Sequence, residues 1–146
     1  MRKHDIYLIE KEVAFHYFGR EQVLYHFFVE ASDPAPHLKE TIKKQLLYIT
    51  KTIPFYVFDY HVKKIDALQK GYRLQRARQE LTLYSKTSKA MLQNNGRNLS
   101  LISEGSYEAE ILLFEHLRKV ESSFLAINFE EEGVGWLSPV KQAHYI

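Results

Sequence analysis

The amino-acid sequence predicts an α+β fold in which a mostly antiparallel sheet has helices packed against it. Three observations support this fold class: an Asn95–Gly96 pair lies between two apolar runs, several segments carry apolar residues at helical spacing, and short β-branched and aromatic runs occur near both ends of the chain. The 146 residues contain no internal repeat and no long linker, so we expect residues 1–146 to form a single domain.

The N-terminal third predicts one strand followed by helices. Residues 6–9 are β-branched and aromatic and predict a strand, after which helical spacing begins at Glu10. Glycine destabilises a helix interior by about 1 kcal/mol, so we expect a kink or break at Gly19. The proline-containing loop at 32–36 ends the next helical segment, and an amphipathic helix is expected at 37–50.

The hairpin is the clearest local signal. A type I′ turn needs positive φ at both central residues, which Asn95 and Gly96 tolerate. Pairing outward from a two-residue turn at 95–96 places Leu92 opposite Leu99 and Ala90 opposite Leu101. These apolar pairs fall on one face, as expected of a sheet that is covered on one side.

The remaining segments complete the predicted fold. Residues 53–68 fit either a helix or a strand, and we favour a helix. A helix is expected at 106–120, with Ser106 as its N-cap, acidic residues in its first turns and basic residues in its last. A strand that is buried on both faces near its start is expected at 123–129, and a closing segment at 134–140.

Composition excludes several classes of function. The chain has no Cys, which excludes disulfide scaffolds and thiolate metal sites, and no apolar run is long enough for a membrane span. The N-terminus does not resemble a signal peptide, so we expect a cytoplasmic protein. P-loop, glycine-rich dinucleotide, HExxH and nucleophile-elbow patterns are missing, and we therefore expect neither an enzyme nor a cofactor. His16 and Glu12 share a helix face, but nothing nearby in the sequence completes a metal site.

Two segments are candidates for contact with a macromolecule. Residues 61–89 contain eight basic and two acidic side chains, which fits either a nucleic-acid-binding segment or ordinary solvated faces. Between residues 13 and 29, apolar side chains cover more of a helix than the roughly 100° that one core contact needs. Either this region is buried between other helices, or it presents a protein-binding face of the aromatic kind that interfaces favour.

Short segments spread over nearly the whole chain resemble one protein family. They are YLI at 7–9, HYFGRE at 16–21, YIT at 48–50, IP at 53–54, YEAE at 107–110, FE at 114–115, LRKV at 117–120, FLA at 124–126 and GWLSPV at 135–140. This ordered set resembles the sporulation inhibitor of replication (SirA) family of spore-forming bacilli. The likeness is strong at both ends of the chain and weak at 55–89.

The resemblance implies a non-enzymatic inhibitor that binds the N-terminal domain of the replication initiator DnaA. Such inhibitors stop new rounds of chromosome replication in cells committed to sporulation, and any contact with nucleic acid is indirect. The partner-binding residues implied by the resemblance are Val13, Tyr17 and Gln45 in this sequence. Tyr17 and Gln45 match the family's residue types, whereas the family has Phe in place of Val13. The same likeness implies that Val13 and Tyr17 point outward and that Phe15 and Phe18 point to the core.

Overall fold

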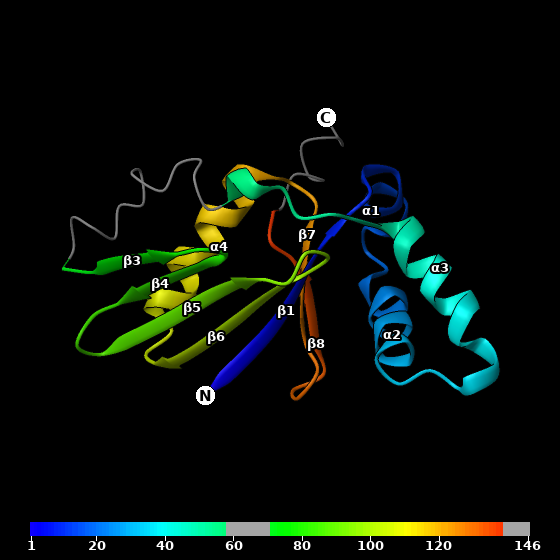
Figure 1. The fold of residues 1–146 in the computed structure, drawn as a ribbon, viewed down its shortest axis with the longest axis horizontal. Helices are drawn as coiled ribbons and strands as arrows, with labels where there is room; N and C mark the ends of the chain where they lie inside the picture. The colour runs from blue at the N-terminus through cyan, green and yellow to red at the C-terminus, as the bar shows by residue number, and fades with distance from the viewer. Residues whose placement is uncertain (58–70, 139–146) are drawn as a thin grey trace.

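The computed structural model describes residues 1–57 and 71–138. In this part of the chain, four α-helices and an eight-stranded antiparallel sheet form the predicted α+β fold (Figure 1). The strands are β1 (Arg2–Ile9), β2 (Thr50–Lys51), β3 (Arg73–Ala77), β4 (Glu80–Tyr84), β5 (Ser88–Asn94), β6 (Leu99–Gly105), β7 (Phe124–Asn128) and β8 (Gly133–Trp136). The helices are α1 (Lys11–Tyr17), α2 (Glu21–Ser32), α3 (Lys39–Ile49) and α4 (Glu108–Val120), with 3-10 turns η1 (Pro36–Leu38) and η2 (Phe55–Val57).

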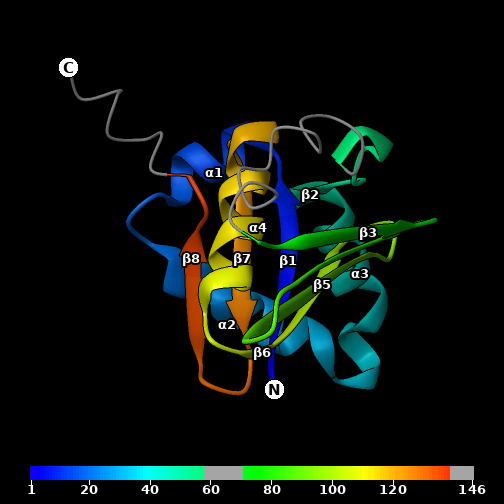
Figure 2. The ribbon, with the colours of Figure 1, turned by 90° about the vertical axis from the view of Figure 1, so that its left-hand side faces the viewer.

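The sheet is organised around β1. Its strand order is β3-β4-β5-β6-β1-β7-β8, and the short β2 pairs with the end of β1. β1 therefore has β6 on one side and β7 on the other, with antiparallel pairing to both. Figure 2 shows β8 and β3, the two edges of the sheet, on either side of α4.

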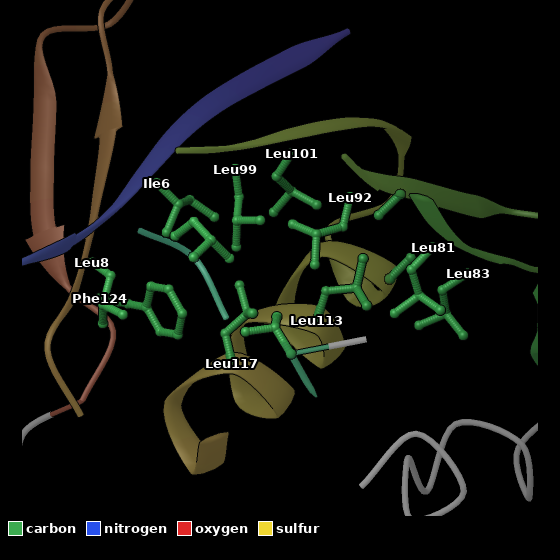
Figure 3. Close-up of a cluster of buried hydrophobic side chains, with 14 of the residues drawn as sticks. Ile6, Leu8, Leu81, Leu83, Leu92, Leu99, Leu101, Leu113, Leu117 and Phe124 are labelled. Atoms are coloured by element: carbon green, nitrogen blue, oxygen red, sulfur yellow. The ribbon is translucent and has the colours of Figure 1, made fainter. Parts of the chain in front are cut away.

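One face of the sheet packs on α4 and encloses the first hydrophobic core (Figure 3). Leu113 and Leu117 are four residues apart, so they lie on the same side of α4, and both are fully buried. The sheet side of this core is formed by aliphatic and aromatic side chains from five strands, namely Ile6, Leu8, Leu81, Leu83, Ala90, Leu92, Leu99, Leu101 and Phe124. This core attaches α4 to the centre of the sheet.

The opposite face of the sheet packs on α1, α2 and α3 and forms a second core. Its buried members are Ile9, Ala14, Leu24, Tyr25, Phe28, Leu125 and Ile127. Successive strand residues point to opposite faces, so Leu8 and Phe124 belong to the first core, whereas Ile9 and Leu125 belong to the second. The prediction that the strand at 123–129 is buried on both faces at its start is confirmed.

The helix break predicted at Gly19 is confirmed. α1 ends at Tyr17 and α2 begins at Glu21, and Gly19 has a φ of +83°, a conformation that glycine adopts without a Cβ clash. The backbone N–H of Gly19 donates to Oε1 of Glu21 at 3.0 Å, and the backbone N–H of Arg20 donates to the carbonyl of Tyr17 at 2.8 Å. These bonds define the corner between the two helices.

The hairpin of β5 and β6 forms, but the predicted register is wrong by two residues. The ladder pairs Leu92 with Leu101 and Ala90 with Ser103, instead of Leu92 with Leu99. A shift of two residues preserves the faces of both strands, so every one of these leucines still lies in the first core. The hydrophobic pattern therefore selects the face but not the register.

The turn chemistry explains the shift in register. The loop spans residues 95–98, and Gly96 has a φ of +95°, whereas Asn95 is outside the left-handed region, so the turn is not type I′. The side chain of Asn94 accepts a bond from the Gly96 N–H at 2.8 Å, and the Asn95 N–H donates to the carbonyl of Asn98 at 2.9 Å. An Asn side chain that bonds two residues onward stabilises this wider turn.

Two further expectations are corrected or fall outside the described residues. Tyr107, not Ser106, occupies the N-cap position of α4. Residues 55–57 of the expected 53–68 helix form the 3-10 turn η2, and the rest of that prediction lies mostly outside the described residues. The last two residues of the expected closing segment at 134–140 are also outside them; the strand itself is β8.

Candidate protein-interaction surface

The start of α1 and the end of α3 are joined by backbone contacts. The N–H of Glu10 donates to the carbonyl of Ile49 at 2.9 Å, and Ile9 of β1 pairs with Thr50 of β2. The hydroxyl of Thr50 in turn donates to the carbonyl of Leu46 at 2.6 Å, inside the last turn of α3. These contacts with the sheet set the relative position of the two helix ends.

On α1, the residues predicted for partner binding lie at the edge of the second core. Ala14 is the buried residue of this helix. Val13 and Tyr17, four residues apart, are half-buried; each packs partly on the second core and leaves part of its side chain at the surface. The expectation that Val13 and Tyr17 point outward is therefore confirmed only in part.

The expectation that Phe15 points to the core is wrong. Its side chain is 66% exposed, whereas Phe18 is half-buried. The physical reason is helical geometry: Phe15 follows the inward-facing Ala14 by one residue and is turned about 100° away from it, while Phe18 lies one turn after Ala14 on the same side.

The ring of Tyr17 is held in place by its neighbours. Its edge-to-face partner is the ring of His16, at a centroid distance of 5.0 Å, and the guanidinium of Arg20 lies 5.2 Å from the centre of the Tyr17 ring. Nη2 of Arg20 also donates to the carbonyl of His16 at 3.3 Å. A cation over an aromatic face is favourable, so this arrangement orders the ring before any partner binds.

A groove of about 540 Å³ separates the start of α1 from the end of α3. Its lining consists of Glu10, Lys11, Glu12, Val13, Leu47, Tyr48 and Lys51. The side chain of Leu47 is 47% exposed and that of Tyr48 is 77% exposed. The groove thus joins Val13 of α1 to two exposed apolar side chains of α3.

Gln45 lies on the same side of α3 as Tyr48. The two residues are three positions apart, which places them as neighbours along one helix face, and both are exposed. The groove brings Val13 and Tyr48 together, whereas Tyr17 and Gln45 are not among its lining residues. We name these four residues of α1 and α3 the α1–α3 surface. Tyr17 stands one turn beyond Val13, and Gln45 one turn before Tyr48.

Leu47 and Tyr48 are candidate site residues that sequence reasoning did not select. The core-facing apolar stripe of this helix consists of Ile42, which is buried, and of Leu46 and Ile49, which pack on the second core. Leu47 and Tyr48 fall off that stripe. Apolar residues outside the core-facing stripe of an amphipathic helix are the signal that points to them.

The described part of the basic segment lies on the far half of the sheet. Arg73 on the edge strand β3, Arg78 in the following turn, and Lys89 on β5 are exposed. Lys89 faces Glu104 across the β5–β6 ladder, so charges of both signs share this surface. The basic residues between 61 and 70 lie outside the described residues.

A buried ionic cluster connects the start of β1 to α4. Nε of Arg2 lies 3.1 Å and Nε2 of His4 lies 3.4 Å from Oε1 of the buried Glu110, to which the hydroxyl of Ser103 also donates. Burial raises the pKa of Glu110, but the hydrogen bonds from Ser103 and Arg2, together with the charges of His4 and Arg2, bring it below its ordinary value. The cluster links β1 and β6 to the first turns of α4.

The described residues contain no group of three His, Asp or Glu side chains that could hold a metal ion, and none of their helices is long and apolar enough to cross a membrane. His16 and Glu12 are both exposed on α1.

Comparisons with known proteins agree with the resemblance described above. A family model described as "Sporulation inhibitor of replication protein SirA" matches residues 2–141. The sporulation inhibitor of replication protein SirA of Bacillus subtilis (strain 168) is 33% identical over 148 aligned positions, which cover 99% of each chain. Because both matches run almost from end to end, the chain belongs to the SirA family of sporulation inhibitors of replication.

Proposed function

We propose that this protein inhibits the initiation of chromosome replication during sporulation by binding the N-terminal domain of the initiator DnaA in the cytoplasm. The observation that carries the proposal is the end-to-end match to the SirA family, whose Bacillus subtilis relative is named as a sporulation inhibitor of replication. The choice of DnaA as the partner rests on the family resemblance. The partly apolar α1–α3 surface supports a protein partner.

The proposed mechanism is occupancy of the partner's surface. Val13 and Tyr17 offer apolar area that the fold leaves partly uncovered, and Gln45 offers an amide that can donate and accept hydrogen bonds at an exposed position. Since Tyr17 is already ordered by His16 and Arg20, binding costs little side-chain entropy there. Docking of this surface would block self-association or loading of the initiator, without any catalytic step or cofactor.

The experiment is calorimetric titration of the purified protein with the isolated N-terminal domain of the initiator from the same organism. Tyr17→Ala and Gln45→Ala are expected to weaken saturable one-to-one binding by about 10-fold or more, as hot-spot residues do. Gln45 is exposed, so its variant should keep the melting temperature of the wild type. Matched controls are Tyr107→Ala, an exposed tyrosine beside α4, and Gln22→Ala, an exposed glutamine of α2.

The titration has two informative failures. Wild-type affinity in a folded Gln45→Ala and a folded Tyr17→Ala would place the interface elsewhere. A wild-type protein that does not bind the initiator domain would refute the proposed partner.

The alternative is a small nucleic-acid-binding domain that uses residues 61–89. Exposed basic side chains at Arg73, Arg78 and Lys89 favour it, whereas Glu80 and Glu104 on the same half of the sheet oppose it. An affinity for duplex DNA that falls steeply with salt and is lost in Lys89→Ala would support this alternative.

A further inference from the structure

We propose that Asn95 is a site of spontaneous deamidation, a covalent modification that needs no enzyme, and that the hydroxyl of Ser100 controls its rate. Asparagine is a chemically labile residue. Asn95 precedes Gly96 in the loop between β5 and β6, and both residues are exposed. Deamidation turns a neutral amide into a carboxylate and so adds a negative charge to this loop. The reaction takes place within the chain, so it does not depend on the partner proposed above.

The reaction is an attack of the backbone on a neighbouring side chain. The nitrogen of Gly96 loses its proton to solvent and forms a bond to Cγ of Asn95, which closes a succinimide ring. The bond from Cγ to Nδ2 breaks, and the amide nitrogen leaves as ammonia after taking up a proton from water. Water then opens the ring at either carbonyl. The products are aspartate and isoaspartate, in which the chain continues through the side-chain carboxyl.

Gly96 offers little steric hindrance to this ring closure. It has no side chain, and its φ of +95° leaves open space where a Cβ would stand. Asn98 in the same loop and Asn128 at the end of β7 are followed by leucine and phenylalanine, whose side chains crowd the attacking nitrogen. We therefore expect Asn95 to react first among these three asparagines.

Two hydrogen bonds restrain the reacting groups. Nδ2 of Asn95 donates to Oγ of the buried Ser100 at 2.8 Å, and the N–H of Gly96 donates to Oδ1 of Asn94 at 2.8 Å. The first bond restrains the side chain that must present Cγ to the nitrogen, and the second holds the proton that the nitrogen must lose. A hydrogen bond of ordinary strength corresponds to a factor of about five in rate. The two bonds therefore slow the reaction without preventing it.

The same loop attaches the β5–β6 hairpin to the segment that follows β2. The carbonyl of Gly96 accepts a bond from the N–H of Ile53 at 2.9 Å, and Nη1 of Arg97 donates to the hydroxyl of Thr52 at 3.0 Å. Isoaspartate inserts an additional atom into the backbone immediately before Gly96, which displaces its carbonyl from Ile53. The isoaspartate form, once separated by chromatography, should therefore melt at a lower temperature than the unmodified protein.

The experiment incubates the folded protein at neutral pH and follows each asparagine by peptide mapping in a mass spectrometer. Labelling with an isoaspartyl methyltransferase distinguishes isoaspartate from aspartate. Asn95 is expected to lose its amide faster than Asn98. Ser100→Ala should raise the rate at Asn95 by about fivefold, because it removes one restraining hydrogen bond. Ser106→Ala, at an exposed serine outside the loop, is the matched control and should leave this rate within about twofold of the wild type.

Melting temperatures and the rate at Asn128 are measured alongside, since a variant that opens the whole fold would accelerate deamidation there as well. Acceleration confined to Asn95 supports control by Ser100, and an unchanged rate in a folded Ser100→Ala refutes it. If Ser100→Ala does not fold, Asn94→Ala takes its place, because it removes the other restraining bond and should have the same effect. An Asn95 that reacts no faster than Asn98 in the folded wild type overturns the proposed site.

Discussion

Arg2, at the start of β1, and Glu110, in the first turns of α4, form an ion pair with Nε and Oε1 3.1 Å apart. Arg2 also donates to the carbonyl of Gly105 at 3.0 Å and stacks its guanidinium 4.1 Å from the centre of the Tyr107 ring. One side chain from the second residue of the chain thereby fastens the loop that leads into α4. The ion pair thus holds β1, the central strand, to α4, the helix that covers the first core.

We expect acid to weaken this tie. The pKa of Glu110 is lower in the folded protein than in the unfolded chain, so the carboxylate contributes stability that is present above its unfolded pKa and is lost as pH falls through the folded value. The melting temperature should therefore fall progressively below about pH 4.5. Glu110→Gln should lower the unfolding free energy at pH 7 by about 3 kcal/mol, because it leaves Arg2 without its charged partner, and should flatten the acid decline.

The matched control for that prediction is Glu115→Gln. Glu115 also has a lowered pKa, caused by its hydrogen bond from Arg118 on the same helix, but this pair is at the surface, where solvent and salt screen it. Thermal melts at several pH values should show a much smaller effect for this variant. Equal effects of the two substitutions would contradict the structural role assigned to Glu110.

We expect Ser88 rather than Ser106 to stabilise the start of α4. Oγ of Ser88 accepts a bond from the Ala109 N–H at 2.9 Å and donates to the Ser106 carbonyl at 2.7 Å, although it belongs to β5. Ser88→Ala leaves a buried N–H without a partner and should cost about 1–3 kcal/mol in urea unfolding. Ser106→Ala should change stability by less than about 0.5 kcal/mol, because its side chain makes no capping bond. If Ser106→Ala instead cost more unfolding free energy than Ser88→Ala, the N-cap role predicted for Ser106 from the sequence would be correct.

The glycines at 105 and 96 should differ in their tolerance of alanine. Both have positive φ, at +78° and +95°, so alanine is strained at either position by about 1–2 kcal/mol. At Gly105 a Cβ would also lie 2.2 Å from the Thr87 carbonyl oxygen, whereas the space at Gly96 is open. Denaturant unfolding should therefore show a larger loss for Gly105→Ala. Similar losses would mean that the backbone at Thr87 moves away from the added Cβ at little cost.

Leu113 should be among the most sensitive positions of the first core. It is fully buried against the sheet, and Leu113→Ala removes three carbons from a closely packed site, which typically costs about 2–5 kcal/mol. Ile111→Ala, on the exposed side of the same helix, is the control and should cost less than about 1 kcal/mol. Equilibrium unfolding in urea measures both. A small loss at Leu113 would show that α4 contributes little to the core.

Local chemistry in the sequence accounts for much of this fold. Gly19 breaks the helix because of its own backbone freedom, and the run 123–129 is a strand because of its own apolar and β-branched residues. The hairpin at Asn95–Gly96 also follows from neighbouring residues alone. In each case the decisive interaction lies within a few residues of the signal, so periodicity and turn residues are sufficient to predict it.

Only the tertiary structure decides features that depend on residues distant in the chain. The cap of α4 comes from Ser88 on a neighbouring strand, and the hairpin register depends on turn hydrogen bonds that leave the hydrophobic pattern unchanged. Helical spacing alone could not show that Phe15 faces outward, since two sides of α1 carry aromatic residues. The groove between Val13 and Tyr48 exists because β1 and β2 bring together the ends of two helices, so that these two residues, 35 positions apart in the sequence, line one hollow. A surface built from two helices is a property of their packing, which no local pattern records.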